Sequence, residues 1–216
     1  MLLYPILGIL GGLLCATGDL LLDLKGKDNR MIDANKMISS NWISMKRWRF
    51  LVSIILALFG VPLIMLGGIS LAEQISNSNE SLGNMFYLSV LIGSMGGFFI
   101  HTILCIVPIL FQELRKITDE EKSCYIILVI WKAVCIPFLS LYLILILLGS
   151  ILLITAIIKG YLFVPLWCVC LNPLCFSVIG VLLRKIFPKY CYELPGICMP
   201  SLGLSMFGVI TLIHLL

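Results

Sequence analysis

The chain has 216 residues, of which 61% are apolar and only 12% carry a formal charge. Ordinary soluble domains carry about 25% charged residues, so this composition excludes a water-soluble globular fold. The net charge of +4 arises in short connections between apolar runs and not on one basic domain, which excludes a nucleic-acid partner. We therefore expect an all-α, polytopic transmembrane bundle surrounded by membrane lipids.

The apolar runs predict six membrane-spanning helices within one domain, residues 1–216. A spanning helix needs about 20 mostly apolar residues. The expected spans are 2–24, 50–73, 84–112, 137–158, 162–183 and 194–216. The first run has no basic stretch before it and continues past any plausible cleavage site, so we interpret it as an uncleaved helix.

The connection between the first two spans is expected to form an amphipathic helix on the membrane surface. Its apolar residues recur at helical spacing, and its basic residues lie elsewhere. The apolar positions are Met31, Ala34, Ile38, Trp42, Met45 and Trp48. This pattern favours a lipid-facing anchor, and a role in gating access to a binding site is the alternative.

The apolar region from 126 to 158 is too long for one straight crossing. Pro137 interrupts it, and proline lacks the N–H that a helix interior requires. We expect a helix over 120–136 that starts at the membrane interface, a kink at Pro137 and then the span. A re-entrant segment over 120–136 is the alternative.

The distribution of positive charge predicts the orientation of the chain. Thirteen of the 15 Lys and Arg residues lie in the connections 25–49, 113–125 and 184–192, and only Lys159 lies in a connection on the opposite side. Positively charged connections tend to stay in the cytoplasm. We therefore expect a plasma (inner) membrane protein with both termini outside.

Polar side chains within the spans are the candidates for a binding site, because ionisable groups in hydrocarbon are costly and commonly functional. The candidate ligand-binding residues are Asp19, Asp23, His101, Cys105, Asn172 and Glu193. The competing explanation for Asn172 is the chemistry of a proline kink, because Pro173 follows it. The competing explanation for Glu193 is the capping of a helix start.

Spacing predicts that two of these residues meet. Asp19 shares one face of its helix with Gly11, and His101 shares one face of its helix with Gly93 and Gly97. Because glycines allow close helix packing, we expect the first and third spans to touch and Asp19 to pair with His101. The pair is either a structural hydrogen bond or a site that passes a proton.

The sequence predicts neither a metal site nor a cofactor. The chain has two histidines, and most of its nine cysteines fall inside apolar runs without a paired framework. His101 and Cys105 form an i, i+4 pair, but no further ligand follows at the spacing of a zinc site. The chain also contains no nucleophile elbow, phosphate-binding loop or dinucleotide fingerprint.

Short features spread over nearly the whole chain form a recognisable combination. They are Gly18-Asp19, Trp42, Trp48-Arg49, Pro62-Leu63, Gly96-Gly97, His101, Pro108, Pro165-Leu166-Trp167 and Asn172-Pro173. In these features the chain resembles an uncharacterised family of bacterial six-helix integral membrane proteins, a domain of unknown function. The resemblance implies a six-helix membrane bundle and no particular activity. It agrees with Asp19, His101 and Asn172 as the positions of interest.

Together these features favour a protein that binds or moves a small molecule or lipid, apolar or amphipathic, in a polar cavity built by Asp19, His101 and Asn172. One alternative is an intramembrane enzyme that acts on a lipid or isoprenoid substrate, with His101 as general acid or base. That function requires a nucleophile or a metal beside His101. The other alternative is an accessory or immunity-type membrane protein without a ligand, whose interior is expected to lack a cavity.

Overall fold

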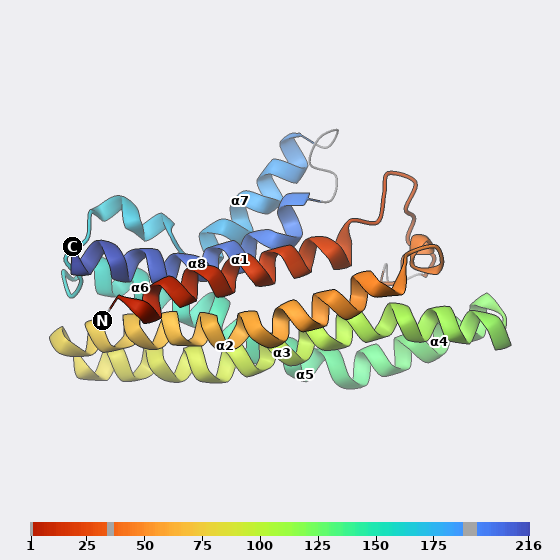
Figure 1. Ribbon diagram of the computed structural model, residues 1–216, viewed down its shortest axis with the longest axis horizontal. Helices are drawn as coiled ribbons and strands as arrows, with labels where there is room; N and C mark the ends of the chain where they lie inside the picture. Colours follow the sequence, from red (N-terminus) through yellow and green to blue (C-terminus); the bar gives the residue numbers. More distant parts are fainter. Residues whose placement is uncertain (1, 34–36, 188–193) are drawn as a thin grey trace.

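The computed structural model describes residues 2–33, 37–187 and 194–216, and it confirms the all-α fold class. The protein is 85% helical, and the described ranges contain no strand. The helices form an elongated bundle in which the two ends of the chain lie together at one end (Figure 1). The connections from α1 to α2 and from α3 to α4 lie at the opposite end, which therefore carries most of the basic residues.

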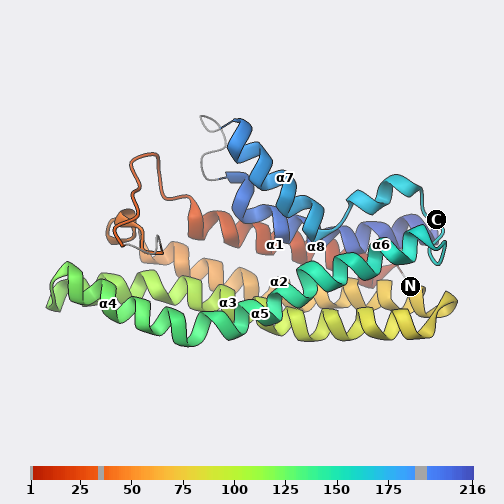
Figure 2. The same cartoon turned by 180° about the vertical axis from the view of Figure 1, so that it is seen from behind.

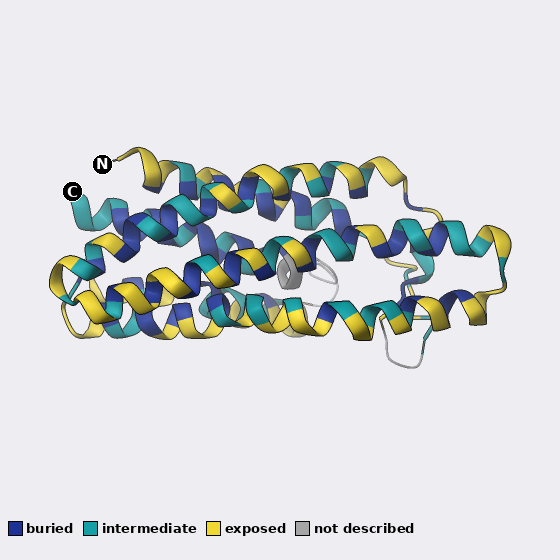
Figure 3. Cartoon of the chain, turned by 90° about the horizontal axis from the view of Figure 1, so that it is seen from below, coloured by how far each residue is buried: buried dark blue, intermediate teal, exposed yellow. Residues whose placement is uncertain are grey.

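Among the described residues, five helical segments are long and apolar enough to cross a membrane, so the chain is a membrane protein. They are α1 (Leu3–Asp23), α2 (Arg47–Ser78), α3 (Glu80–Ile117), the run Glu120–Ile158, and α8 (Leu194–Leu215) with its apolar stretch Cys198–Leu215. Exposed residues recur along these helices (Figure 3), and many of them are large apolar residues. This surface suits hydrocarbon and not water.

Glycines bring α1 into direct backbone contact with α2. A methyl group added to Gly8 would lie 2.6 Å from the Cα of Gly67, and one added to Gly11 would lie 2.5 Å from the carbonyl oxygen of Gly60. Gly12, on another side of α1, faces Ser205 of α8 in the same close manner. α1 is therefore held between α2 and α8, with no room for larger side chains.

The prediction that the first and third spans pack against each other is wrong. In the described chain, α1 packs mainly on α2 and α8, and α3 packs mainly on α2 and α5. The glycines of α3 serve the second contact, because Gly93 faces Leu145 and Gly96 faces Leu141. α1 and α3 still meet through side chains, because Nδ1 of His101 lies 3.2 Å from Oδ1 of Asp19.

The helical run Glu120–Ile158 continues past Pro137 without reversing direction (Figure 2). Two π-helical turns interrupt its α-helical parts. The elements are α4 (Glu120–Ile130), η2 (Trp131–Cys135), α5 (Ile136–Leu143), η3 (Ile144–Gly149) and α6 (Ser150–Ile158). The wider turn η2 lies immediately before Pro137, where the helix must accommodate a missing N–H. The run therefore bends along α3, and no re-entrant segment occurs at 120–136.

The connection between α1 and α2 differs from the expected amphipathic helix. Its described part contains only one short 3-10 helix, η1 (Ser40–Ile43). Polar side chains and turns replace helical hydrogen bonds: Asn41 Nδ2 donates to the carbonyl oxygen of Lys25 at 2.9 Å, and the backbone N–H of Ser40 donates to that of Arg30 at 2.8 Å. Asn and Ser compete with helical bonding in this way.

Some apolar residues of this connection pack against protein, whereas Met31 and Trp48 remain about half exposed. Ile38, Trp42 and Met45 are all buried, and they join an apolar cluster with residues of α3 and α4. The helical spacing of these residues therefore reflects burial against neighbouring helices. Ala34, which belongs to the same pattern, lies outside the described residues.

The fifth expected span, 162–183, is helical only in its second half. A short 3-10 helix, η4 (Leu166–Cys170), precedes α7 (Pro173–Ile186), which has 14 residues and is too short to span a bilayer alone. Pro165 and Pro173 explain the break, because each removes an N–H that a continuous helix would use. α7 leaves the bundle at an angle (Figure 1). The sixth expected span corresponds to α8.

Two apolar clusters fill the interior of the bundle at different depths. The larger one includes Phe86, Leu153 and Phe207 and occupies the half that carries the chain termini. The smaller one includes Phe50 and Phe111 and occupies the end that carries the basic connections. Asp19 lies between them along α1, after Cys15 of the larger cluster and before Leu22 of the smaller one.

Candidate functional site

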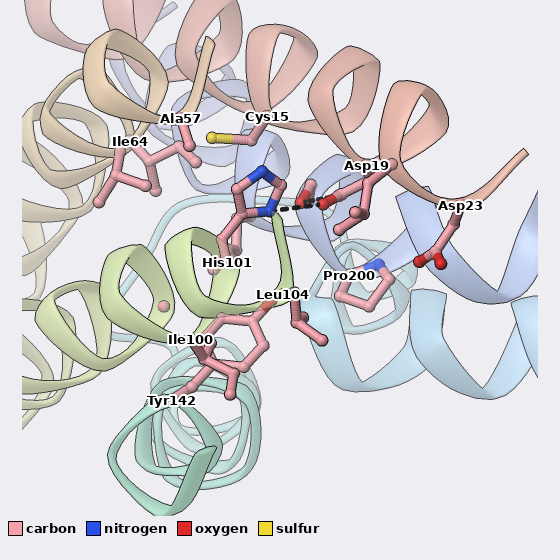
Figure 4. A pocket seen from close by; sticks show the side chains of 15 residues that line it. Cys15, Asp19, Asp23, Ala57, Ile64, Ile100, His101, Leu104, Tyr142 and Pro200 are labelled. Atoms are coloured by element: carbon pink, nitrogen blue, oxygen red, sulfur yellow. Dashed lines mark hydrogen bonds and ion pairs between the residues drawn. The ribbon is translucent and has the colours of Figure 1, made fainter. Parts of the chain in front are cut away.

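A cavity of about 260 Å³ lies between α1, α2, α3, α5 and α8. Most of its wall is apolar, and several polar side chains from different helices also line it (Figure 4). They are Asp19 and Asp23 of α1, His101 of α3, Tyr142 of α5 and Ser201 of α8. The cavity is not fully enclosed by the bundle.

Asp19 and His101 form a pair across this cavity. Nδ1 of His101 lies 3.2 Å from Oδ1 of Asp19, and the Ser201 hydroxyl donates a hydrogen bond to Oδ2 of Asp19 at 2.6 Å. The side chain of His101 is only 11% exposed and that of Asp19 only 14%. A buried carboxylate is tolerated when both of its oxygens find donors, and here each oxygen has one.

Ser53 of α2 contacts the second ring nitrogen of His101. Its Oγ lies 2.9 Å from Nε2 of His101 and 2.7 Å from the carbonyl oxygen of Gly18. The carbonyl can only accept, so the single hydroxyl proton of Ser53 goes to Gly18. Ser53 Oγ must then accept from His101, which means that Nε2 carries a proton. The Cys105 thiol also donates to Ser53 Oγ, at 3.4 Å.

This assignment determines the charge of the pair. With Nε2 protonated, one further proton lies in the hydrogen bond between Nδ1 of His101 and Asp19. The pair is then either imidazolium with carboxylate or neutral imidazole with carboxylic acid. Both forms have zero net charge, so the pair adds no uncompensated charge to the membrane interior.

Two other predicted site residues lie near the pair. Asp23 lines the cavity one helical turn from Asp19 and forms an ion pair with Lys25, Nζ to Oδ1, at 2.9 Å. Cys105 is fully buried behind His101 and does not line the cavity. Asp23 is thus a wall residue at the basic end, and Cys105 supports the pair from outside.

The prediction that Asn172 shares this cavity is wrong. Asn172 is fully buried, its Oδ1 accepts from the backbone N–H of Cys175 at 3.0 Å, and its Nδ2 donates to the carbonyl oxygen of Val169 at 2.7 Å. Because Pro173 interrupts the helix, the amide is consumed in capping α7. Glu193, the remaining candidate, lies outside the described residues.

Three residues of the site were not predicted: Ser53, Ser201 and Tyr142. The sequence pattern assigns the two serines to stripes of small residues, which indicate packing only. These residues could have been found from their expected depth in the membrane. Hydroxyl groups at the same depth as Asp19 and His101 are the available hydrogen-bond partners for that pair. Among the described residues, no group of three or more His, Cys, Asp or Glu side chains is close enough to hold a metal ion.

The pairing predicts strong coupling between Asp19 and His101. Replacing either residue with alanine leaves a buried polar partner and should cost about 3–5 kcal/mol of unfolding free energy. The double variant leaves no orphaned charge, so its loss should fall short of the sum of the single losses by about 0.5–3 kcal/mol. Reversible unfolding in detergent micelles measures this cycle, and additive losses would contradict the pairing.

Comparison with known proteins agrees with the resemblance to an uncharacterised family. The model of a family of unknown function (DUF6796) matches residues 1–216. No curated protein and no solved structure matches the chain. The geometry of the site is therefore the basis for any functional conclusion. By the match over its whole length, the chain belongs to the family of unknown function DUF6796.

Proposed function

We propose that this protein binds a small amphipathic molecule or a lipid within the membrane, with the polar group of the ligand at the Asp19–His101 pair. One observation carries the proposal: the pair faces a cavity that is not fully enclosed and whose walls are mostly apolar. A pair that served only to join helices would be better enclosed by packed side chains. The cavity also speaks against a ligand-free accessory role, which predicts a closed interior.

The shape of the interior favours binding over conduction. The larger apolar cluster occupies the half of the bundle toward the chain termini, so the described interior in that direction is mainly apolar. The cavity, at about 260 Å³, is slightly smaller than the roughly 300–1,000 Å³ of sites that enclose a drug-sized ligand. It suits a polar head group and the first part of a tail.

Binding at the pair predicts that a ligand is retained during purification and depends on Asp19. Protein purified in mild detergent is denatured, and the released small molecules are identified by mass spectrometry. Wild-type protein should release one species at near-equal molar amount, and Asp19→Asn and Ser201→Ala should each reduce it at least fivefold. Ser205→Ala is the matched control, because the Ser205 hydroxyl donates to Leu202 of its own helix.

If no species is enriched over a detergent blank, or if Ser205→Ala reduces retention as much as Ser201→Ala does, the binding proposal is wrong. Size-exclusion profiles of each variant separate loss of ligand from loss of fold.

We also propose a six-span arrangement in the plasma membrane, with both chain ends outside and the basic connections in the cytoplasm. The support is the location of both chain ends at one end of the bundle and of the basic connections 25–49 and 113–125 at the other. η4 and α7 together would form the fifth crossing. Its non-helical half would lie against α6, with which η4 is in contact.

This orientation predicts the behaviour of reporter fusions. Alkaline phosphatase folds to an active enzyme only outside the cytoplasm, so a fusion after Leu216 should be active and a fusion after Thr118 should be inactive. A green fluorescent protein fused at the same two positions should give the reverse pattern. Activity of the phosphatase at Thr118 would overturn the orientation.

A second candidate function is a hydrolase that cleaves a lipid ester. Ser53, His101 and Asp19 are connected by distances of 2.9 and 3.2 Å in the order of a Ser–His–Asp triad. Two features make this the weaker candidate. Ser53 is fully buried, and the nitrogen that faces it carries a proton and cannot act as a base. The hydroxyl would first have to leave the Gly18 carbonyl.

A fluorophosphonate probe distinguishes the two candidates, because it reacts with activated serines. We expect no labelling of wild-type protein in lipid nanodiscs beyond that of the Ser53→Ala variant. Labelling that is lost in both Ser53→Ala and His101→Ala would establish the hydrolase instead.

A further inference from the structure

The cavity wall contains one polar group that the Asp19–His101 pair does not use, the hydroxyl of Tyr142. This side chain extends from α5 toward the pair (Figure 4). Within the described chain its Oη makes no hydrogen bond. The ring rests on Gly97, where an added methyl group would lie 2.9 Å from ring Cδ2. The missing side chain at Gly97 therefore allows the Tyr142 ring to occupy this position beside the cavity.

Apart from the Tyr142 hydroxyl, the donors around the described part of the wall are already engaged, and carboxyl groups lie beside them. Both nitrogens of His101 are engaged, Nδ1 by Asp19 and Nε2 by Ser53. Lys25 is paired with Asp23. An anion entering the cavity would instead face the carboxyl groups of Asp19 and Asp23.

A cationic head group is disfavoured for a different reason. The Asp19–His101 pair is already neutral, and so is the Asp23–Lys25 pair, so an added cation would remain uncompensated in a medium of low dielectric constant. An uncharged group with both a donor and an acceptor avoids this cost. It can donate to the remaining lone pairs of Asp19 and accept from the Tyr142 hydroxyl.

We propose that the ligand is a lipid alcohol, an uncharged molecule with a hydroxyl head and an apolar tail, and that Tyr142 binds its hydroxyl. This inference rests on the proposed binding function and adds the chemical class of the ligand and a binding residue. The neighbouring wall residues Leu22, Ile100 and Leu104 provide apolar contacts for the start of the tail. Because the cavity is small and not fully enclosed, the rest of the tail extends into the surrounding lipid.

The test uses three photoreactive probes that differ only in the head group. Hexadecanol, hexadecanoic acid and hexadecylamine, each with a diazirine at the same carbon near the head, are incorporated into nanodiscs with the full-length protein. After illumination, mass spectrometry quantifies labelling of peptides from α1, α3 and α8. The alcohol should label these peptides saturably, in competition with unlabelled hexadecanol, and at least tenfold more efficiently than the acid or the amine.

Two variants test the role of Tyr142. Tyr142→Phe removes only the hydroxyl and should weaken competition by unlabelled alcohol about threefold to tenfold, the equivalent of one hydrogen bond. Tyr125→Phe, on the exposed face of α4, should leave competition unchanged. An unaltered affinity in Tyr142→Phe would overturn the assignment of this residue.

The outcomes separate the inference from the proposed function. If the acid or the amine labels the cavity peptides as well as the alcohol does, the cavity binds a ligand but the chemical class is wrong. If no probe labels them while a native molecule still co-purifies in an Asp19-dependent manner, the lipid-alcohol inference fails and the binding function stands. If no probe labels them and nothing co-purifies, both fail.

Discussion

The hydrogen bond between Asp19 and His101 allows this bundle to contain a polar site at membrane depth. An isolated carboxylate at membrane depth is expensive, and so is an isolated imidazolium. Joined, they are neutral, and the remaining polar atoms are satisfied by Ser201 and Ser53. These four side chains come from α1, α3, α8 and α2, so the site joins the first three long helices to the last one.

This arrangement depends on helices that approach closely enough for short side chains to meet. Ser53 can bond to the carbonyl oxygen of Gly18 only because the glycine leaves space: an added methyl group would lie 3.3 Å from the Ser53 carbonyl oxygen. Closer to the chain termini, Gly8 and Gly67 bring α1 and α2 into backbone contact. Glycine packing and the polar site are therefore one structural unit, in which the first determines the geometry of the second.

Composition and periodicity were sufficient to predict the fold class, and the cost of buried charge was sufficient to predict the Asp19–His101 pair. The helices that pack against α1 and α3 were not predictable from the glycines. Those of α1 contact α2 and α8, whereas those of α3 contact the α4–α6 run. Glycine spacing shows that a close contact exists and does not identify the partner. The prediction for Asn172 was wrong for a related reason. An amide side chain beside a proline bonds to the nearby backbone, here the carbonyl oxygen of Val169.

The connection between α1 and α2 bears on how a ligand would reach the cavity. Gln112 Nε2 donates to the carbonyl oxygens of Trp42 and Met45, at 2.6 and 2.8 Å, and Arg47 donates to Gln112 and Glu113. These bonds fasten the connection onto α3, and its buried apolar residues fill the basic end of the bundle.

Both ends of the interior are therefore occupied by apolar side chains, one by the larger cluster and the other by this connection. The cavity between these filled ends is not fully enclosed. Under the proposed binding function, a ligand would enter it between helices, from the surrounding lipid. A molecule that arrives through lipid must itself be largely apolar, and only its polar group requires the Asp19–His101 pair. The packing of the ends thus favours the same class of ligand as the hydrogen-bonding inventory of the wall.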